Sequence, residues 1–357
     1  MAFDFEDDNY ENIFSEAITI NKYTSQGFEF SSDHKTLLMA PKDIIEFEVP
    51  DFVTTIGPSA FKSCEMLERI VLHDSIRSIA KDAFEYCSAL KTFELPNSIE
   101  CINLSFRNCT SLSSITIPDT VKTIKAFNLR GCKSLKDIRL PKSLETVMLY
   151  LKECTSLSSL IIPESVKEIT SLVFEGCTSL KEIVFTNTLK VGYLDLSNSS
   201  ITSLPDNLKV GGGLYLSHTP IKVLPNNLCA DCLDLSHTLI TSLPDNLKVK
   251  YSIYLSHTPI TSLPDNLKVG WDLDLSNTPI TSLPDNLEVE CNLVLSNTPI
   301  TSLPDNLKVG GDLDLSNTPI TSLPDNLKVG WDLDLSNTPI TSLPDNLKVG
   351  GKVVGLK

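Results

Sequence analysis

The sequence has 357 residues and a formal net charge of −15 at pH 7. A surface with this much negative charge repels phosphate groups, so we expect neither nucleic acid nor an anionic membrane surface as a partner. No apolar run approaches the roughly 20 residues of a membrane span, so no membrane insertion is predicted. The first residues are acidic where a secretory signal is basic and then apolar. The sequence therefore predicts a cytoplasmic protein, with signal-independent export as the alternative.

Residues 1–43 are predicted to form an N-terminal cap. The first residues are acidic, including Asp4, Glu6 and Glu11, and we expect a solvated tail that ends before Ile18. The apolar segments 28–30 and 36–39 flank a Ser-Ser-Asp-His turn signal, and this pattern predicts a hairpin. A hairpin at this place would cover the open end of a repeat array.

Residues 44–185 form a tandem repeat with a period of 22 or 23 residues. Each copy carries a short apolar strand, a turn, an Ile and then an Ala-Phe pair or its equivalent. We expect the last part to form a short helical turn on the convex side. The predicted strands are 45–49, 69–72, 92–95, 114–117, 137–140, 159–162 and 182–185.

The same residues resemble the Treponema-type, or BspA-like, leucine-rich repeats of bacterial and protist surface antigens. The family's pattern of Pro, Val, Ile, Ala-Phe, Cys and Ser-Leu is matched at 96–112, 118–135 and 163–180. The helical-turn positions drift in these copies, to 104–106, 127–129 and 149–151. The resemblance implies a leucine-rich solenoid and, as its setting, adhesion or host interaction.

Six cysteines recur every 22 or 23 residues, at Cys64, Cys87, Cys109, Cys132, Cys154 and Cys177. This spacing places one cysteine at the same corner of each coil. Disulfides or a metal ladder are one interpretation, and small buried side chains are the other. The absence of a secretory signal favours buried free thiols.

Residues 186–357 repeat with a shorter period of 20, and once of 19 between residues 229 and 247. In each copy a Leu-x-Leu strand points its two leucines inward and its neighbours outward. Ile320, Leu323, Leu327 and Val329 supply the other inward side chains of a typical coil. The unit resembles the short repeats of secreted bacterial effectors, which often precede a ubiquitin-ligase domain. We expect the C-terminal end to be uncapped and capable of self-association.

Two clusters in this half invite sharper hypotheses. Cys229 and Cys232 form a Cys-x-x-Cys pair, but no βαβ unit surrounds it, so repeat drift is favoured over redox chemistry. His218, His237 and His257 occupy one position in three successive coils, where later coils carry Asn. Stacked histidines could hold zinc, while repeat drift also explains them. We predict no metal and no cofactor.

The outward strand positions are the predicted binding surface. They are acidic, with Tyr and Trp at the edge, and we name them the strand face. Its residues are Tyr193, Asp195, Tyr215, Asp234, Tyr254, Trp271, Asp272, Asp274, Asp312, Asp314, Trp331, Asp332 and Asp334. Like charges directly opposite one another are unfavourable, so the ladder either binds a basic partner or is a product of repeat copying. Both alternatives stay open at this point.

The sequence contains no catalytic motif, and we predict that the protein is not an enzyme. The predicted fold is an α/β solenoid: a right-handed leucine-rich repeat with a continuous concave parallel sheet, short strands and few convex helical turns. The predicted function is a protein-binding scaffold for a partner with a basic surface. The alternatives are the substrate-targeting arm of an effector that lacks its catalytic domain, and a structural spacer with no ligand.

Overall fold

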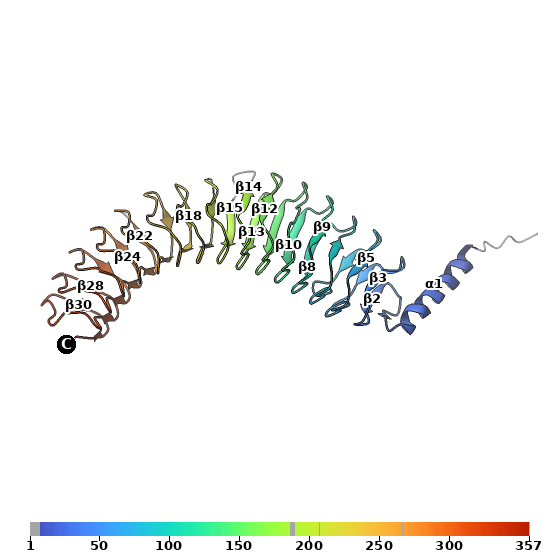
Figure 1. The fold of residues 1–357 in the computed structure, drawn as a ribbon, viewed down its shortest axis with the longest axis horizontal. Coiled ribbons are helices and arrows are strands. Elements are labelled where there is room, and N and C mark those ends of the chain that lie inside the picture. The colour runs from blue at the N-terminus through green and yellow to red at the C-terminus, as the bar shows by residue number, and fades with distance from the viewer. Residues whose placement is uncertain (1–7, 186–189, 207, 266, 357) are drawn as a thin grey trace, which may run out of the picture. The chain divides into compact units, whose positions relative to one another are not determined.

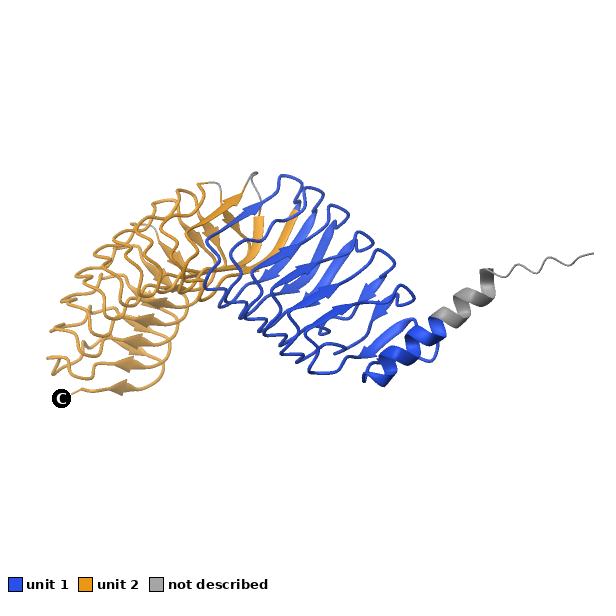
Figure 2. Cartoon of the chain, turned by 45° about the vertical axis from the view of Figure 1, so that its right-hand side comes forward, with its two compact units in different colours: residues 1–167 blue, residues 168–357 orange. Residues whose placement is uncertain are grey.

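The computed structural model describes residues 8–185, 190–206, 208–265 and 267–356, with side chains from residue 16 onward. The chain divides into two compact units, residues 1–167 and 168–357 (Figure 2). In both units, successive turns of the chain stack as the coils of a parallel β-solenoid (Figure 1). This architecture confirms the predicted leucine-rich solenoid. Among the described residues, no helix is long and apolar enough to cross a membrane.

Unit 1 begins with helix α1 (Asp8–Ser25), which corrects the prediction of a solvated tail before Ile18. The segment contains no Pro or Gly, and Ile13, Ala17 and Ile20 recur at the spacing of a helix face. Residues 1–7, the rest of the predicted acidic tail, lie outside the described residues. Near the C-terminal end of α1, Tyr23 packs edge-on against Phe28, with ring centroids 5.5 Å apart.

The predicted hairpin is confirmed. Strands β1 (Glu29–Phe30) and β2 (Thr36–Met39) pair in antiparallel fashion. From β2 onward the pairing is parallel, because each further strand belongs to the next coil: β4 (Thr55–Ile56) follows β2, and β6 (Ser78–Ile79) follows β4. The hairpin therefore closes one end of this sheet.

Most strands predicted for the longer repeat are present. The pairs are β3 (Glu46–Glu48) with β5 (Arg69–Val71), and β7 (Thr92–Glu94) with β9 (Ser114–Thr116). β12 (Ser159–Ile162) and, in unit 2, β14 (Glu182–Phe185) also lie where predicted. Residues 137–140 form no strand, so this one prediction is wrong.

The predicted convex helical turns are also wrong in three coils. β8 (Cys101–Ser105), β10 (Thr123–Asn128) and β11 (Thr146–Tyr150) form a parallel sheet that includes most of these positions. Their apolar side chains alternate, as Ile102 and Leu104 do, so the period is that of a strand. Ala60-Phe61 and Ala83-Phe84 lie in turns, as the first copies of the repeat predicted.

Phenylalanine rings from successive coils stack along the core of unit 1. The ring of Phe84 is stacked on Phe61 at 5.1 Å and on Phe106 at 5.7 Å, and it meets Phe93 edge-on at 4.9 Å. All four rings are buried. Each coil thus covers the aromatic ring of its neighbour, which no coil could do alone.

Unit 2 contains one long parallel sheet built from the Leu-x-Leu positions. It runs through β13 (Glu168–Val173), β15 (Lys190–Asp195), β17 (Gly213–Tyr215), β19 (Cys232–Asp234), β21 (Ile253–Tyr254), β23 (Leu273–Asp274), β25 (Leu293–Val294), β27 (Leu313–Asp314), β29 (Leu333–Asp334) and β31 (Val353–Val354). Their register is that of the 19- and 20-residue repeats, so Leu273, Leu293 and Leu313 lie side by side.

A second series of short strands in unit 2 starts each coil. It comprises β16 (Lys209–Val210), β18 (Cys229–Ala230), β20 (Lys248–Val249), β22 (Lys268–Val269), β24 (Glu288–Val289), β26 (Lys308–Val309), β28 (Lys328–Val329) and β30 (Lys348–Val349). The residues predicted to point inward, such as Leu315, Ile320 and Leu327, are fully buried. At the strand exits, Thr318 Oγ1 donates to the Leu315 carbonyl at 2.7 Å, and the other coils repeat this bond. The threonines thus satisfy a backbone carbonyl where the chain leaves the strand.

Candidate functional site

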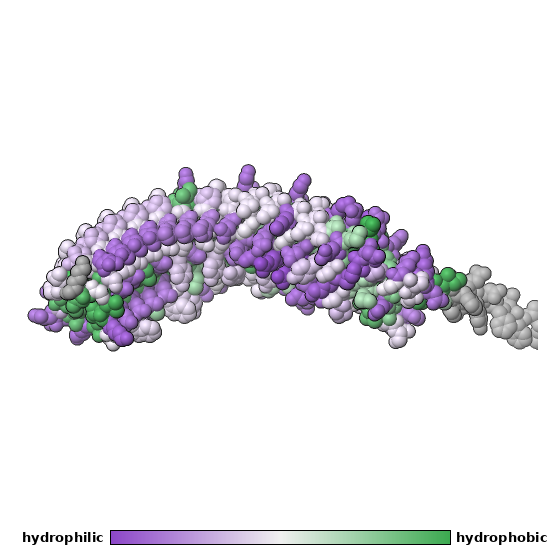
Figure 3. Space-filling model, turned by 60° about the horizontal axis from the view of Figure 1, so that its bottom comes forward, coloured by the Kyte–Doolittle hydropathy of each residue, from purple (hydrophilic) through white to green (hydrophobic). Residues whose placement is uncertain are grey.

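All residues of the predicted strand face lie in unit 2, on the long parallel sheet or directly beside it. The register puts Asp314 opposite Asp334, as predicted, whereas Tyr254 separates Asp234 from Asp274. Val294 interrupts this series, because it lies between Asp274 and Asp314 in the register. Figure 3 shows a row of hydrophilic side chains along one side of the solenoid. The structure therefore brings the predicted residues together on successive coils.

One series of aspartates ends five of the strands, β15, β19, β23, β27 and β29, and closes the turn that follows each. Oδ1 of Asp234, Asp274, Asp314 and Asp334 accepts the backbone N–H of the serine two residues later, at 2.7–2.9 Å. Asp195 makes the same bond at 3.0 Å and is buried. This Asx turn stabilises the exit from the strand. These carboxylates thus have a structural role that the sequence analysis missed.

The other series connects neighbouring coils. Asp312 Oδ1 accepts the backbone N–H of Asp332 at 2.8 Å, and Asp332 Oδ1 accepts that of Lys352 at 2.7 Å. Asn292 continues the ladder by accepting the N–H of Asp312 at 2.8 Å. Each carboxylate receives an amide dipole, and hydrogen bonds to ionised groups are the stronger ones. These bonds offset the repulsion that the sequence implied for stacked aspartates.

The two tryptophans are the most exposed aromatic groups at the edge of the face. Trp271 is 53% exposed and Trp331 is 62% exposed. Trp271 packs on Tyr251 with ring centroids 4.4 Å apart, and Lys250 Nζ lies 4.5 Å from the centre of the Tyr251 ring. Sequence analysis missed Tyr251, although it stands at the repeat position of Trp271 one coil earlier. Exposed Trp beside Tyr is the side-chain chemistry of interface anchors.

The tyrosines at the start of the face are less accessible. The rings of Tyr193 and Tyr215 lie 5.3 Å apart. Gly213 makes room for this contact, because a Cβ there would lie 2.3 Å from the Tyr215 ring. Burial, then the nearby Asp195 carboxylate, raises the pKa of Tyr193 to about 12, and burial also raises the pKa of Tyr215. Both phenols are therefore neutral hydrogen-bonding groups at physiological pH.

The three histidines form a stack beside the face. Ring centroids are 4.2 Å apart between His218 and His237, and 4.3 Å apart between His237 and His257, with nearly parallel planes. All three residues have φ near +58°, a conformation that Asn also tolerates, and Asn277 continues the series at φ +57°. Within the described part of the chain, no group of three or more metal-ligating side chains could hold a metal ion. The zinc hypothesis therefore finds no support.

The histidine stack predicts lower stability at acidic pH. The pKa of His237 lies below its usual value of 6.5. Burial is the largest cause, and the charges of His218 and His257 add to it. The unfolded chain therefore binds more protons than the folded chain near that pH, and the free energy of unfolding falls as the pH drops through it. We therefore expect the Tm to decline as the pH falls through 6.5 and below it. In a variant with His218, His237 and His257 all replaced by Asn, the part of the Tm decline that comes from the histidine stack should disappear. A Tm decline equal to that of the native chain would contradict this role of the histidine stack.

The six repeat cysteines are all buried, and none of them forms a disulfide bond. In unit 1, Cys87 Sγ donates to the Phe61 carbonyl and Cys109 Sγ to the Phe84 carbonyl, each at 3.1 Å. Burial raises the pKa of Cys64 to about 11, and hydrogen bonding from Cys109 together with burial raises the pKa of Cys87 further. The cysteines are therefore confirmed as buried packing groups, rather than as members of a disulfide ladder.

Thiol labelling of the native protein checks this interpretation. Thiolates rather than thiols react with disulfide reagents, so the six buried cysteines should react only after unfolding. Cys101 is exposed and Cys229, Cys232 and Cys291 are partly exposed, so these four should react first. Rapid labelling of any buried repeat cysteine in the native state would overturn the packing role.

Cys229 and Cys232 occupy ordinary repeat positions. Cys229 lies opposite Lys248, and Cys232 lies opposite Gly213, in parallel strands. Both thiols are free, and no helix begins after them. The structure thus supports repeat drift rather than a redox pair.

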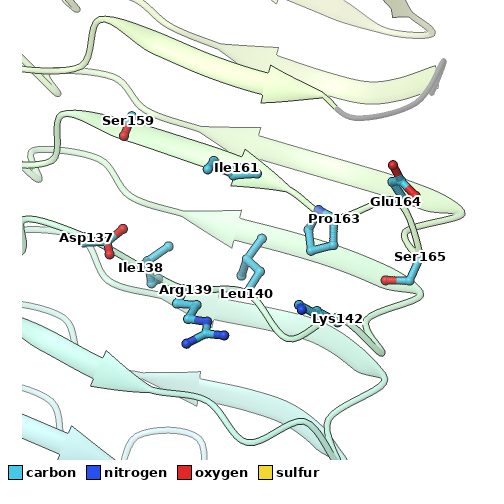
Figure 4. Close-up of a pocket in the computed structure, with 10 residues that line it drawn as sticks. All are labelled: Asp137, Ile138, Arg139, Leu140, Lys142, Ser159, Ile161, Pro163, Glu164 and Ser165. Atoms are coloured by element: carbon cyan, nitrogen blue, oxygen red, sulfur yellow. The ribbon is translucent and has the colours of Figure 1, made fainter.

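Unit 1 carries a separate hollow where the predicted strand 137–140 is missing. It encloses about 750 Å³ and is lined by Ile138, Leu140, Ile161 and Pro163, with Lys142 nearby (Figure 4). Ile161 is 59% exposed, while Ser165 Oγ is buried with no hydrogen-bond partner among the described residues. This apolar hollow contains none of the predicted site residues.

The family described as the BspA type leucine rich repeat region matches residues 38–105 and 103–210, in six copies. No curated protein matches the sequence. Among solved structures, a leucine-rich repeat protein of Treponema pallidum is 25% identical, with a TM-score of 0.40; the match covers 48% of this chain and 85% of that one.

Two further bacterial structures match most of this chain. A leucine-rich repeat protein of Bacteroides ovatus is 18% identical with a TM-score of 0.44, covering 91% of this chain and 88% of that one. YopM, a leucine-rich effector protein of Yersinia pestis, is 17% identical with a TM-score of 0.31, covering 90% of this chain and 88% of that one.

Proposed function

We propose that unit 2 is a non-enzymatic scaffold that binds a basic protein. Residues 38–210 of the chain belong to the BspA-type leucine-rich repeats. A solenoid of this family presents an extended surface to partners. The finer proposal is that the strand face does the binding and that the partner is a host protein.

The observation that carries the proposal is the combination of charge and exposed aromatic rings on one surface. Each carboxylate of the Asp312–Asp332 ladder uses Oδ1 for a backbone amide, so the ladder is held rigidly in register. Preorganised charges lose little conformational freedom on binding. Trp271 and Trp331, each more than half exposed, supply apolar area at the edge of the same surface.

We also propose that the protein acts in a reducing compartment such as the cytoplasm. None of the ten cysteines forms a disulfide bond. Cytosolic thiols are normally kept reduced, whereas exported proteins tend to oxidise them. To test this proposal, a tagged form of the chain is expressed in the producing cell and its free thiols are counted. An oxidised pair of cysteines would contradict a reducing compartment.

Comparative capture tests the binding proposal. Native chain, a strand-face variant and an off-face control are immobilised and incubated with the same host lysate. The face variant replaces Asp272, Asp274, Asp312, Asp314, Asp332 and Asp334 by Asn. The control replaces the exposed turn aspartates Asp245, Asp265, Asp285, Asp305, Asp325 and Asp345 by Asn. We expect basic proteins to be retained by native chain and control and released from the face variant; equal retention by all three contradicts the proposal.

A further inference from the structure

Unit 2 contains a second charged surface of opposite sign. A groove of about 730 Å³ is lined by Lys190, Lys209, Lys248, Lys250 and Lys268, and by one acidic residue, Asp231. We name it the lysine groove. Its apolar floor comes from the short strands β16, β18 and β20. Five ammonium groups around one hollow are unexpected in a chain of net charge −15.

Departures from the repeat both add and remove charge here. Lys250 stands where the next coil carries Gly270, and where the preceding coil carries Asp231. Asn226 replaces the aspartate that precedes the short strand in the other coils, such as Asp245. One charge is lost by the same drift, because Cys229 replaces a lysine. These changes cancel, so the surplus of lysines comes mainly from the repeat position of Lys209, Lys248 and Lys268.

The lysines approach one another within the sheet. Lys190 and Lys209 are register partners on β15 and β16, so their Cα atoms are direct neighbours across adjacent parallel strands. The Lys190 side chain lies over Gly211, where a Cβ would come within 2.2 Å of Cε and 2.9 Å of Nζ. The glycine thus leaves room for the ammonium group at the wall of the groove.

Most of these charges lack a compensating carboxylate. Lys268 pairs with Glu288 at 2.8 Å. Among the described residues, Lys190, Lys209 and Lys248 form no ion pair, and Lys250 lies over the Tyr251 ring. Neighbouring like charges repel, and an anion bound between them would remove that repulsion.

We propose that the lysine groove binds a compact polyanion that carries two or more phosphate or sulfate groups. The ammonium groups bind these groups as point charges and hydrogen-bond donors. The groove holds a ligand of small-molecule size, and the surrounding negative charge of the chain disfavours a long nucleic acid. The strand face, which binds a cation-bearing partner, is a different surface, so either proposal can fail alone.

Calorimetric titration of the full chain tests the proposal. Sodium tripolyphosphate and a heparin tetrasaccharide are the two probes, and they distinguish a phosphate from a sulfate ligand. The groove variant carries Lys190→Gln, Lys209→Gln and Lys248→Gln. The matched control carries Lys308→Gln, Lys328→Gln and Lys348→Gln, which removes the same charge from three register partners at the same repeat position.

We expect at least one probe to bind the native chain and the control alike. The groove variant should bind about tenfold more weakly or not at all, because each lost charge-assisted contact is worth a substantial part of the affinity. Unchanged Tm values show that both variants are folded. Equal weakening in both variants, or no binding of either probe to the native chain, would overturn the proposal.

Discussion

Replacing Phe84 by Ala should destabilise unit 1 by about 3–5 kcal/mol, the range found for large aromatic residues in well-packed cores. Phe84 is buried, and its ring contacts Phe61, Phe93 and Phe106 at 4.9–5.7 Å. The substitution therefore removes three ring contacts and leaves a cavity between coils. Since each coil is buried only by its neighbours, we expect the coils on both sides of the cavity to lose protection together.

Chemical denaturation followed by circular dichroism measures this loss, and hydrogen exchange locates it. Met66 is 51% exposed and provides the control, because Met66→Ala removes a large apolar side chain without creating a cavity. We expect a change within about 0.5 kcal/mol for the control, as for most surface substitutions. A Phe84→Ala variant within about 1 kcal/mol of the native chain would show that the phenylalanine stack does not hold the coils together.

The strand-face variant should lose binding without losing stability. Asn keeps the Oδ1 acceptor, so the bonds from Asp314 to the Ser316 N–H and from Asp312 to the Asp332 N–H can persist. Removing the charges also relieves the repulsion between Asp314 and Asp334, which are register partners. We therefore expect a Tm equal to or above that of the native chain.

Binding should respond in the opposite direction. Exposed charge pairs contribute roughly 0.2–1 kcal/mol each, so six of them account for about tenfold or more in affinity. The control with six turn aspartates replaced has the same net charge as the face variant. A difference between the two variants therefore reports the position of the charges and not their number. Loss of the fold in the face variant, seen as a lowered Tm, would show instead that Asn cannot replace these hydrogen bonds.

The tandem period predicted the solenoid because each coil repeats one burial pattern. Positions such as Leu315 and Ile320 are apolar in every full copy of the 20-residue repeat, and only a stack of coils buries them all. The hairpin at β1 and β2 was predictable for a similar reason, because a local turn signal fixes it. Local periodicity and repeat spacing therefore account for the confirmed part of the fold.

The errors arise where two local patterns compete. Residues 101–105 resemble a drifted Ala-Phe turn, yet Ile102 and Leu104 alternate and pair with β10 across the coil boundary. Helix α1 was missed because its acidic residues suggested a tail, although its apolar residues have a helical period. The missing strand at 137–140 has no signal in the sequence, and the structure gives no single residue that explains it.

The placement of the strand-face residues was predictable, but their hydrogen bonds were not. The outward aspartates and tryptophans could be identified from alternation in the Leu-x-Leu strand. Their hydrogen bonds could not, since Asp312 reaches an amide 20 residues away in the next coil. The tilted contact between the Tyr251 and Trp271 rings likewise depends on the distance between neighbouring coils.

The most direct test of the account is the salt dependence of the affinity for the captured basic partner. The Kd is measured for native chain, face variant and turn-aspartate control at about 50 mM and about 300 mM salt, where screening differs strongly. We predict that native chain and control lose affinity with salt to the same extent, and that the face variant binds weakly at both concentrations. A face variant with native affinity and native salt dependence would contradict the claim that the strand face is the binding surface.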